Sequence, residues 1–597
     1  MSDAAALVPG NRVDYDAALT SPPLANLRRI GGEMFNWTDG DPRRGPARPR
    51  GALLRHLIGT LAGPGRSVLV AGPHDDDLVA ALAGGGAEVT WLLRSLGDAE
   101  AAARAHPAIT ALAGSPVKLD PAERFDLVVA ADGVDRLNSS EGEQMSAAEL
   151  IDRLAGAVRA GGALLLVHDN PLGVHHTVRL EPGAREHDDA AWYPADDHDI
   201  HRPASREQLA DRLTAAGLVV DTTYAAFPEP AAPTVLVGPG LLDSGSAPLR
   251  PRLGTALSQA FAAGFRGRPV LSDPRRLVHR ALRAGAEGTI APAWLVIARA
   301  PGASAAPAHE LLIGDTNSTF AYAVSHAGGE VRSTVLEPLG EPVERAGLRR
   351  VAEMDAPGSD AGYVLEERLL HLCAVAGLRE LRTELTGYAS WLNDRATDGT
   401  IAGRAALAGL ADVFVTPDGP ALLPTRWTPI EPIPLETVLV RAFWEFAVEL
   451  ITTARPHPWP ITSSAADLTA ILLGMVGRGV PDGALRAAVE LRITVETAEF
   501  GLSPEEQRDR EVQLRAVTPG TGPIDIPGYR ELSEALWRQR YEASHLLAMM
   551  EWTERIIGAR DHDLSKMDRE IQFYRGRPAG KMVVAAKEAY RVVRRRK

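Results

Sequence analysis

The sequence predicts an α/β protein that begins with a doubly wound parallel sheet and ends in helices. Three observations predict this fold class. Between residues 51 and 243, short apolar runs alternate with stretches of helical periodicity, which is typical of parallel β-α-β units. From 301 to 460, helices mix with short strands, and beyond 461 the pattern is almost wholly helical. A chain of 597 residues, 45% hydrophobic and 24% charged, has room for several globular domains.

The elements of the first domain follow from local patterns. Residues 1–50 are rich in Pro, Gly and Arg without a sustained period, and we expect an irregular segment there. Helices are expected at 51–63, 78–83, 99–105, 147–160 and 206–216, and strands at 67–71, 88–93, 125–130, 163–168 and 233–238. The domain is therefore placed at 51–243, and a connecting α/β segment at 244–300 contains an expected strand at 290–298.

The second half is predicted to contain an α+β domain at 301–460, with a hairpin at 412–423 that turns at Pro417-Asp418-Gly419. A helical region is expected at 461–528. Residues 529–575 carry a broken heptad, which fits either a coiled coil or an ordinary amphipathic helix, and Gly576 and Pro578 end it. The apolar positions are Leu546, Met550, Ile557, Leu564, Met567, Ile571 and Tyr574.

Charge and rare residues exclude several classes of protein. A net charge of -13 argues against a protein that coats nucleic acid, and the single cysteine, Cys373, excludes an intramolecular disulfide framework. Neither a secretory signal nor an apolar run of about 20 residues is visible, so we expect a cytoplasmic protein. Only five lysines occur, and none lies between 119 and 565: Lys118, Lys566, Lys581, Lys587 and Lys597.

A series of short motifs carries a resemblance. Their order and spacing resemble the methyltransferase half of bacterial surface-polysaccharide proteins, the family of methyltransferase-kinases that terminate O-antigen chains. The resemblance implies a class I, Rossmann-like fold that binds S-adenosylmethionine (SAM), and a kinase-like second half. The motifs are Phe125 to Val129 with Gly133, His168-Asp169-Asn170-Pro171-Leu172-Gly173, Glu186-His187, Arg202 to Leu209, Tyr224 with Phe227-Pro228, and Ala291 to Leu295.

The cofactor site implied by the resemblance is incomplete. The family has E-x-G-x-G-x-G after the first strand and an acidic residue at the end of the second. Here the first turn keeps one glycine, Gly72, and Leu93 stands where the acid is expected. The candidate cofactor-binding residues are Gly72, Asp75, Asp76 and Gly133. We expect SAM binding to be possible but impaired, with one of the aspartates as a substitute acceptor.

The kinase-like half is also predicted to lack its chemistry. Phosphoryl transfer needs a strand lysine and metal-binding carboxylates. The domain contains no lysine, Leu407 stands where the catalytic base is expected, and 424–427 reads Pro-Thr-Arg-Trp in place of the family's D-x-E-W. We therefore expect a pseudokinase that uses neither ATP nor Mg²⁺.

One acidic loop offers catalytic candidates. His187 and Glu186 fall on a family motif, and His187 is the candidate base for deprotonating a sugar hydroxyl. His187, His198 and His201 stand among acids in 185–201 and could bind a metal. A solvated acidic loop explains the pattern better, so no metal site is predicted.

The last residues form the clearest physical signal. From 577 to 597 there are eight basic residues and one acid, and on a helical wheel the apolar and basic side chains take opposite faces. A basic amphipathic helix suits an anionic membrane surface, although an acidic partner or a solubilising tail would also fit. The predicted docking residues are Lys581, Lys587, Arg591, Arg594, Arg595, Arg596 and Lys597.

These observations predict a methyltransferase-like protein of surface-glycan biosynthesis, inactive or weakly active, that acts as a scaffold or regulator at the inner face of the membrane. The expected partners are glycan-assembly proteins or an intact paralogue, with self-association through the coiled coil and no nucleic acid. The alternative is an active SAM-dependent O-methyltransferase that acts on a sugar hydroxyl of a polysaccharide or glycoconjugate.

Overall fold

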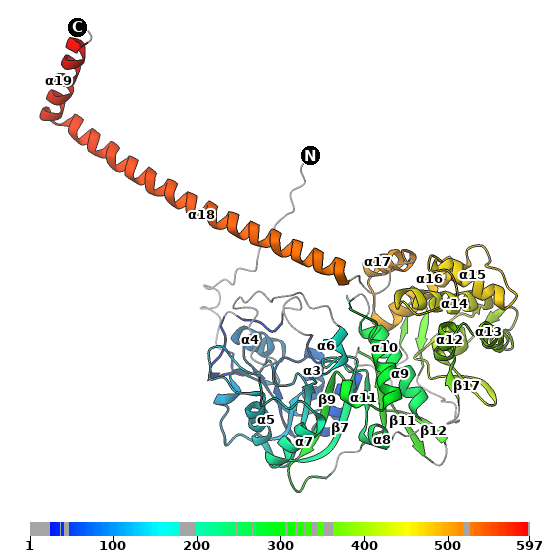
Figure 1. Cartoon of the computed structure of the whole chain (residues 1–597). Coiled ribbons are helices and arrows are strands. Elements are labelled where there is room, and N and C mark those ends of the chain that lie inside the picture. Colours follow the sequence, from blue (N-terminus) through cyan, green and yellow to red (C-terminus); the bar gives the residue numbers. More distant parts are fainter. Residues whose placement is uncertain are drawn as a thin grey trace. The chain divides into compact units, whose positions relative to one another are not determined.

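The computed structural model divides the chain into two compact units, Met1–Ile524 and Asp525–Lys597, which are described separately (Figure 1). The described residues are 24–35, 37–40, 47–178, 199–244, 249–265, 268, 270–304, 308–316, 320–327, 330–336, 343–351, 362–517 and 526–594. The first unit holds all the strands found in these ranges, and the described part of the second is helical.

A 12-stranded sheet is the frame of the first unit. Its strands lie in the order β1-β4-β3-β2-β5-β6-β9-β7-β8-β10-β11-β12. The strands are β1 Leu27–Gly31, β2 Ser67–Ala71, β3 Glu88–Leu93, β4 Thr110–Gly114, β5 Phe125–Ala130, β6 Val158–Asp169, β7 Val219–Phe227, β8 Val235–Val237, β9 Ala293–Arg299, β10 Leu311–Gly314, β11 Ala321–Ala327 and β12 Glu330–Val335.

Strand direction changes in the middle of this sheet. From β1 to β6 every pair is parallel, and β9 then lies antiparallel to both β6 and β7. The remaining strands, β8, β10, β11 and β12, continue the sheet beyond β7 as antiparallel pairs. The carboxyl ends of β2, β3, β5 and β6 therefore meet at one edge, where ligands bind in open α/β sheets.

Helices cover both faces because the strands are apolar on both sides. In β2, Val68 and Val70 enter one core while Leu69 and Ala71 enter the other. The first face carries α2 Ala52–Ala62, α3 Asp76–Gly84 and α4 Leu96–Ala105. The other carries α5 Ala147–Gly156, α6 Val174–Val178, α7 Arg206–Ala215, α8 Pro239–Ser244, α9 Arg250–Gly264 and α10 Pro274–Ala284, and α11 Glu287–Ile290 leads into β9.

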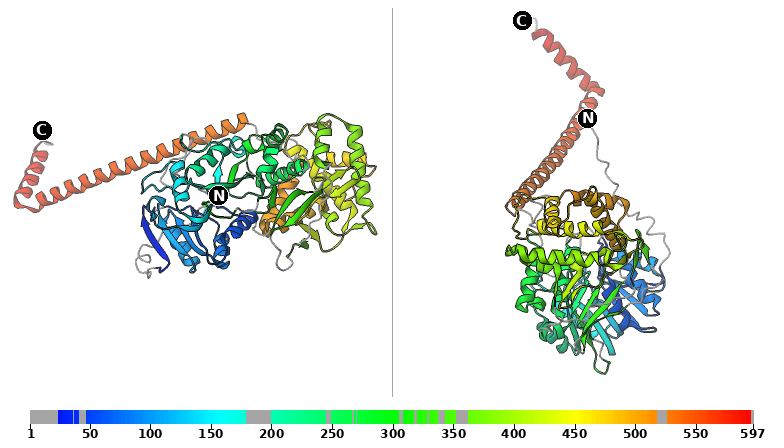
Figure 2. Two further views of the ribbon diagram at one scale, coloured as in Figure 1. Left: turned by 90° about the horizontal axis from the view of Figure 1, so that it is seen from below. Right: turned by 90° about the vertical axis from the view of Figure 1, so that its right-hand side faces the viewer.

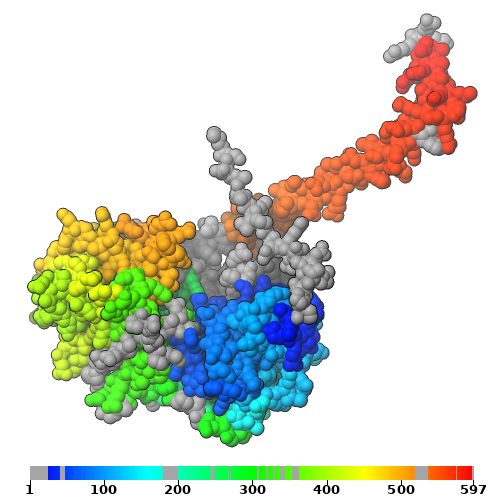
Figure 3. All heavy atoms as spheres, turned by 180° about the vertical axis from the view of Figure 1, so that it is seen from behind, coloured from blue at the N-terminus to red at the C-terminus, as the bar shows by residue number. Residues whose placement is uncertain are grey.

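The rest of the first unit is a mostly helical part beside the sheet (Figures 2 and 3). Its core surrounds α14, which is buried along most of its length. The helices are α12 Leu365–Ala374, α13 Leu378–Asn393, α14 Leu435–Thr452, α15 Ala465–Met475, α16 Ala484–Phe500 and α17 Pro504–Arg515. Small sheets join β13 Glu344–Arg345, β14 Leu348–Arg350 and β19 Trp427–Pro429; β15 Tyr363–Val364, β17 Val413–Thr416 and β18 Gly419–Leu422; and β16 Thr400–Ile401 with β20 Ile433–Pro434.

The second unit consists of α18 Ile526–Gly576 and α19 Pro578–Arg594. Gly576 and Pro578 separate the two helices, as predicted, and the basic tail is helical as far as Arg594. Large apolar side chains along both helices are exposed, among them Ile557 and Met582. Among the described residues, no helix combines the length and apolar character that crossing a membrane requires.

Several segments differ from the sequence-based expectations, and the strands β4 and β7 were not predicted. Residues 27–31, assigned to an irregular segment, form the parallel edge strand β1, because backbone pairing with β4 needs no apolar pattern. The predicted strand at 290–298 is present as β9 but lies in the middle of the sheet. The expected boundary at residue 243 therefore does not coincide with an end of the sheet.

We predict that Gly238→Ala destabilises the junction between β8 and β10. A Cβ at this position would meet the carbonyl oxygen of His309 at 2.1 Å, so the two strands would have to separate. The expected loss is roughly 1–3 kcal/mol of unfolding free energy, measured by denaturant titration of the full chain. In the control, Gly59→Ala on an exposed position of α2, nothing lies within 4 Å, and this change should be neutral or stabilising. Equal effects of both variants would contradict the strand pairing.

Candidate functional site

The predicted cofactor residues lie together at the carboxyl edge of the sheet. Gly72 follows β2 with a φ of 88°, and Gly133 follows β5 with a φ of 76°. Asp75 caps the first turn of α3 by accepting a hydrogen bond from Asp77 N–H, and Asp76 lies 3.2 Å from His106 Nε2. The structure thus brings all four candidates to one edge, with both aspartates engaged in local contacts.

A buried histidine ties two of the strand ends together. His74 Nδ1–H donates to the Gly72 carbonyl at 3.0 Å, and its Nε2 accepts from the Ala131 N–H at 3.2 Å. This arrangement requires the neutral ring, and burial lowers the pKa of His74 to about 4. The imidazole therefore links the turn after β2 to the turn after β5.

An ion pair occupies the end of β3. Arg94, which follows the buried Leu93, donates two hydrogen bonds to Asp39 at 2.9 and 2.6 Å and one to the Asn138 carbonyl at 3.0 Å. The Arg94 and Asp39 side chains are 1% and 4% exposed, and Trp37 lies against the guanidinium. Asp39, from the N-terminal segment, therefore neutralises a buried cation at the end of β3, one position after Leu93.

A second buried pair lies at the end of β5. Arg136 Nε donates to Asp132 at 2.8 Å, and the same guanidinium reaches the Ala47 carbonyl at 3.2 Å. Burial raises the pKa of Asp132 to about 6, although Arg136 opposes the change. Asp39 and Ala47 are thus fastened to the carboxyl ends of β3 and β5.

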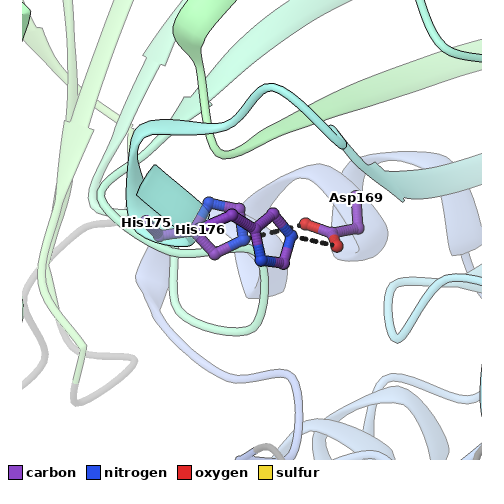
Figure 4. A group of neighbouring side chains, drawn as sticks. All are labelled: Asp169, His175 and His176. Carbon is purple, nitrogen blue, oxygen red and sulfur yellow. Dashed lines mark hydrogen bonds and ion pairs between the residues drawn. The ribbon is translucent and has the colours of Figure 1, made fainter. Parts of the chain in front are cut away.

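Three other side chains converge at the end of β6 (Figure 4). Asp169 Oδ1 lies 2.9 Å from His175 Nε2, and Asp169 Oδ2 lies 2.8 Å from His176 Nε2. Burial disfavours the carboxylate, but the contacts from both histidines outweigh it and hold the pKa of Asp169 well below its usual range. His175 is buried and His176 is 39% exposed, so the group reaches the surface.

Backbone contacts hold this group in place. Asn170 donates to the Thr289 and Ala291 carbonyls, both at 2.7 Å, and accepts from Leu172 N–H at 3.0 Å. A Cβ on Gly173 would meet the His175 ring at 2.5 Å, so only glycine leaves room for it. The H-D-N-P-L-G motif therefore builds the turn that places the two histidines.

Some predicted residues cannot be placed. Glu186, His187 and most of the acidic loop lie outside the described residues, as do Arg595, Arg596 and Lys597. His201 is described, and its backbone N–H donates to Asp199. The other predicted docking residues, Lys581, Lys587, Arg591 and Arg594, all lie on α19.

A cavity of about 860 Å³ in the first unit was not predicted. It lies where α9, α10, α12, α14 and α16 meet, and its lining is strongly charged. Arg492, for example, contacts both Glu445 and Glu496. The charged residues that line it are Asp273, Asp315, Glu366, Glu367, Asp412, Glu445, Glu449 and Glu499 with Arg268, Arg275, Arg426, Arg441, Arg492 and Arg510.

The loop at 407–412, which was predicted to belong to a degenerate kinase-like site, borders this cavity. Leu407 is buried, and Asp412 accepts from the Gly409 N–H at 2.8 Å. Burial raises the pKa of Asp412 above its usual range. Burial and the neighbouring Glu449 also raise the pKa of Glu366 to about 8.

Sequence reasoning missed both the Asp169 group and the cavity. His175 and His176 were adjacent in the sequence, but only the turn at Asn170 and Gly173 brings them onto Asp169. The cavity is formed by helices between 250 and 514, and no local pattern reports it. The adjacent acids Glu366 and Glu367 in the first turn of α12 were the one sequence signal of the cavity. Acids at this position are ordinarily explained by their favourable interaction with the helix dipole.

No protein-family model matches this chain, and no curated protein matches its sequence. Solved structures do resemble it. The [4+2]-cyclase SpnF is 16% identical over 43% of this chain and 88% of its own, with a TM-score of 0.23. The glycopeptide N-methyltransferase MtfA, complexed with sinefungin, is 16% identical over 45% and 93%, with a TM-score of 0.24. The CcbJ methyltransferase from Streptomyces caelestis is 17% identical over 44% and 92%, with a TM-score of 0.23.

The strand order, and not these low scores, defines the fold. Numbered along the chain from β2, without the short β8, the seven strands lie in the order 3-2-1-4-5-7-6, and the seventh is antiparallel. The six-stranded dinucleotide-binding sheet, in the order 3-2-1-4-5-6, lacks this inserted strand. The fold is therefore a doubly wound α/β sheet with one inserted antiparallel strand, in agreement with the predicted fold class.

We predict that Glu367→Gln removes part of the pH dependence of stability. Burial raises the pKa of Glu367 to about 7, against the field of Arg455, and no hydrogen bond reaches the buried Oε1. A raised folded pKa favours folding at low pH, and this contribution is lost as pH rises through about 7. The variant should be more stable than wild type by roughly 1–3 kcal/mol at pH 8 and similar at pH 5. Thermal melts at both pH values, with the exposed Glu330→Gln as control, would detect it, and parallel curves for all three proteins would contradict it.

Proposed function

We propose that this chain is a methyltransferase-like protein of bacterial surface-glycan biosynthesis that does not use SAM and acts as a membrane-associated scaffold. One observation carries the proposal. The strand ends at which this fold would hold its cofactor are tied to each other and to Asp39 and Ala47 by buried side chains, chiefly His74, Arg94 and Arg136.

The ion pair at the end of β3 weighs most against cofactor binding. The resemblance implies a ribose acceptor at Leu93, which offers none, and the next residue, Arg94, is a donor only. Displacing Asp39 would leave a buried guanidinium without its carboxylate, at a cost of about 3–5 kcal/mol. That cost corresponds to a loss of roughly two to four powers of ten in affinity.

The kinase-like region supports the same conclusion. No lysine is present between residues 119 and 565, so no amine can hold the phosphates. Arg426, which replaces a family carboxylate, donates to Glu499 at 3.0 Å, and Leu407 is buried in place of the base. A domain that keeps its fold but lacks the lysine, the carboxylate and the base of phosphoryl transfer is suited to binding other proteins.

The second unit supplies two surfaces for a scaffold. On α18, one apolar residue recurs every seventh position without interruption, which suits pairing with a second copy of the helix. On α19, exposed apolar side chains such as Met582 and Tyr590 stand opposite the basic residues, which suits an anionic membrane. The seven-residue series is Leu536, Ala543, Met550, Ile557, Leu564 and Ile571.

The alternative function is a SAM-dependent O-methyltransferase acting on a sugar hydroxyl. The observation that favours it is the half-exposed His176, whose Nε2 lies 2.8 Å from Asp169 at the end of β6. A histidine oriented by a carboxylate is a common general base. This function requires the crevice to open for the cofactor.

Calorimetric titration of the full chain with S-adenosylhomocysteine separates the two functions. We expect no heat of binding up to millimolar ligand, because the Arg94–Asp39 pair stands at the ribose position. Adenosine serves as a matched ligand without the amino-acid part. Micromolar binding of S-adenosylhomocysteine that Asp76→Ala abolishes would contradict the scaffold function and support the methyltransferase function.

Vesicle flotation tests the membrane surface. The full chain should float with vesicles that contain phosphatidylserine and not with phosphatidylcholine alone, since each cation near the surface contributes about 1 kcal/mol. The double variant Lys587→Glu with Arg591→Glu should remain in the pellet. Lys566→Glu, an exposed charge reversal on α18, is the control and should still float. Flotation unchanged by removal of residues 577–597 would contradict membrane docking.

A further inference from the structure

A second ligand chemistry is available at the sheet edge, away from the Arg94–Asp39 pair. Asp169, His175 and His176 each present one donor atom, and all three atoms lie within 4.8 Å of one another (Figure 4). Both histidines approach with Nε2, one at each oxygen of the same carboxylate. Two imidazole nitrogens and one carboxylate form a ligand set typical of zinc and non-haem iron sites.

We propose that Asp169, His175 and His176 bind one divalent first-row transition-metal ion. Donor atoms at 2.0–2.2 Å from a tetrahedral ion stand about 3.3 Å apart. The observed contacts of 2.9 and 2.8 Å are therefore short of this spacing by about 0.4 to 0.5 Å. Small rotations of the side chains would admit the ion.

The contact with His175 is itself closer to a ligand geometry than to a hydrogen bond. Asp169 Oδ1 is buried and no donor is directed at it with hydrogen-bond geometry, although His175 Nε2 lies at 2.9 Å. The two rings are tilted by 39° with centroids 3.9 Å apart, and the Nε2 atoms of both face the Asp169 carboxylate (Figure 4). A cation between the nitrogens and the carboxylate would satisfy this arrangement.

The surroundings hold the donors as a built site would. Asn170 fixes the backbone after Asp169 by three hydrogen bonds, and Gly173 provides the space for the His175 ring. Arg202 lies 4.0 Å from Asp169 Oδ2 and is neutralised by Asp135 at 2.6 Å. With neutral histidines these groups sum to one negative charge, so a divalent cation is electrostatically favoured.

Three protein donors leave at least one coordination position for water or a substrate oxygen. Closed structural zinc sites have four protein ligands, whereas open sites with three are typical of catalysis. The 39% exposure of His176 gives such an oxygen access from solvent. The class of ligand is thus a hydroxyl or carboxylate oxygen held next to the ion. This inference is independent of SAM, because no cofactor residue takes part in it.

Metal binding to the full chain, after removal of bound ions with a chelator, tests the proposal. Wild type should bind one more equivalent of Zn²⁺ in equilibrium dialysis than His176→Ala or Asp169→Asn, each of which should weaken this site at least tenfold. Co²⁺ should give a visible absorption spectrum of a site with nitrogen and oxygen ligands in wild type only. Mg²⁺ should not compete, because it prefers oxygen donors.

The matched control is His106→Ala. His106 lies 3.2 Å from a carboxylate oxygen of Asp76. The variant therefore removes a histidine that pairs with a carboxylate but has no second histidine beside it. This variant should keep the extra equivalent, because none of the 14 histidines other than His175 and His176 is proposed to supply it. Thermal melts without metal establish that each variant is folded, and Zn²⁺ should raise the melting temperature of wild type and His106→Ala but not of His176→Ala or Asp169→Asn. Equal Zn²⁺ binding and equal Co²⁺ spectra for wild type and Asp169→Asn would show that the three side chains form only two ion pairs, and would overturn the proposal.

Discussion

The pairing of β9 between β6 and β7 is the constraint on which the rest of the first unit depends. It joins the parallel half of the sheet to its antiparallel half. The backbone before β9 also accepts the hydrogen bonds of Asn170, and Asn170 in turn sets the position of Asp169 at the end of β6. The chemistry at this edge is therefore assembled by a strand that comes more than 120 residues after β6, counting from Asp169 to Ala293.

The carboxyl edge of the sheet is held closed by buried polar side chains. His74 links the turns after β2 and β5, Arg94 pairs with Asp39, and Arg136 contacts the Ala47 carbonyl. Each contact is satisfied: His74 is neutral and doubly hydrogen-bonded, and Arg94 has its carboxylate. Because a buried pair is costly only when one partner is removed, the closed arrangement is stable and opening it is expensive.

The charged residues are arranged differently in the two units. Inside the first unit, carboxylates and guanidinium groups balance one another around the cavity, and the acids without close cations have raised pKa values. The second unit has no core to bury, and its exposed residues divide into an apolar series along α18 and a basic face on α19. The scarcity of lysine in the middle of the chain and its return near the end match this division between a framework and a docking segment.

The sequence by itself determined the elements and their class. Period-two and period-3.6 patterns predicted the strands at 67–71, 88–93 and 125–130, the hairpin at 412–423 and the helix break at Gly576 and Pro578, because these depend on neighbours along the chain. Local patterns could not predict β1, the place of β9, the partner of Arg94 or the cavity. The tertiary structure decided them, since hydrogen bonds, ion pairs and buried charges join residues that are distant in sequence and adjacent only in the fold.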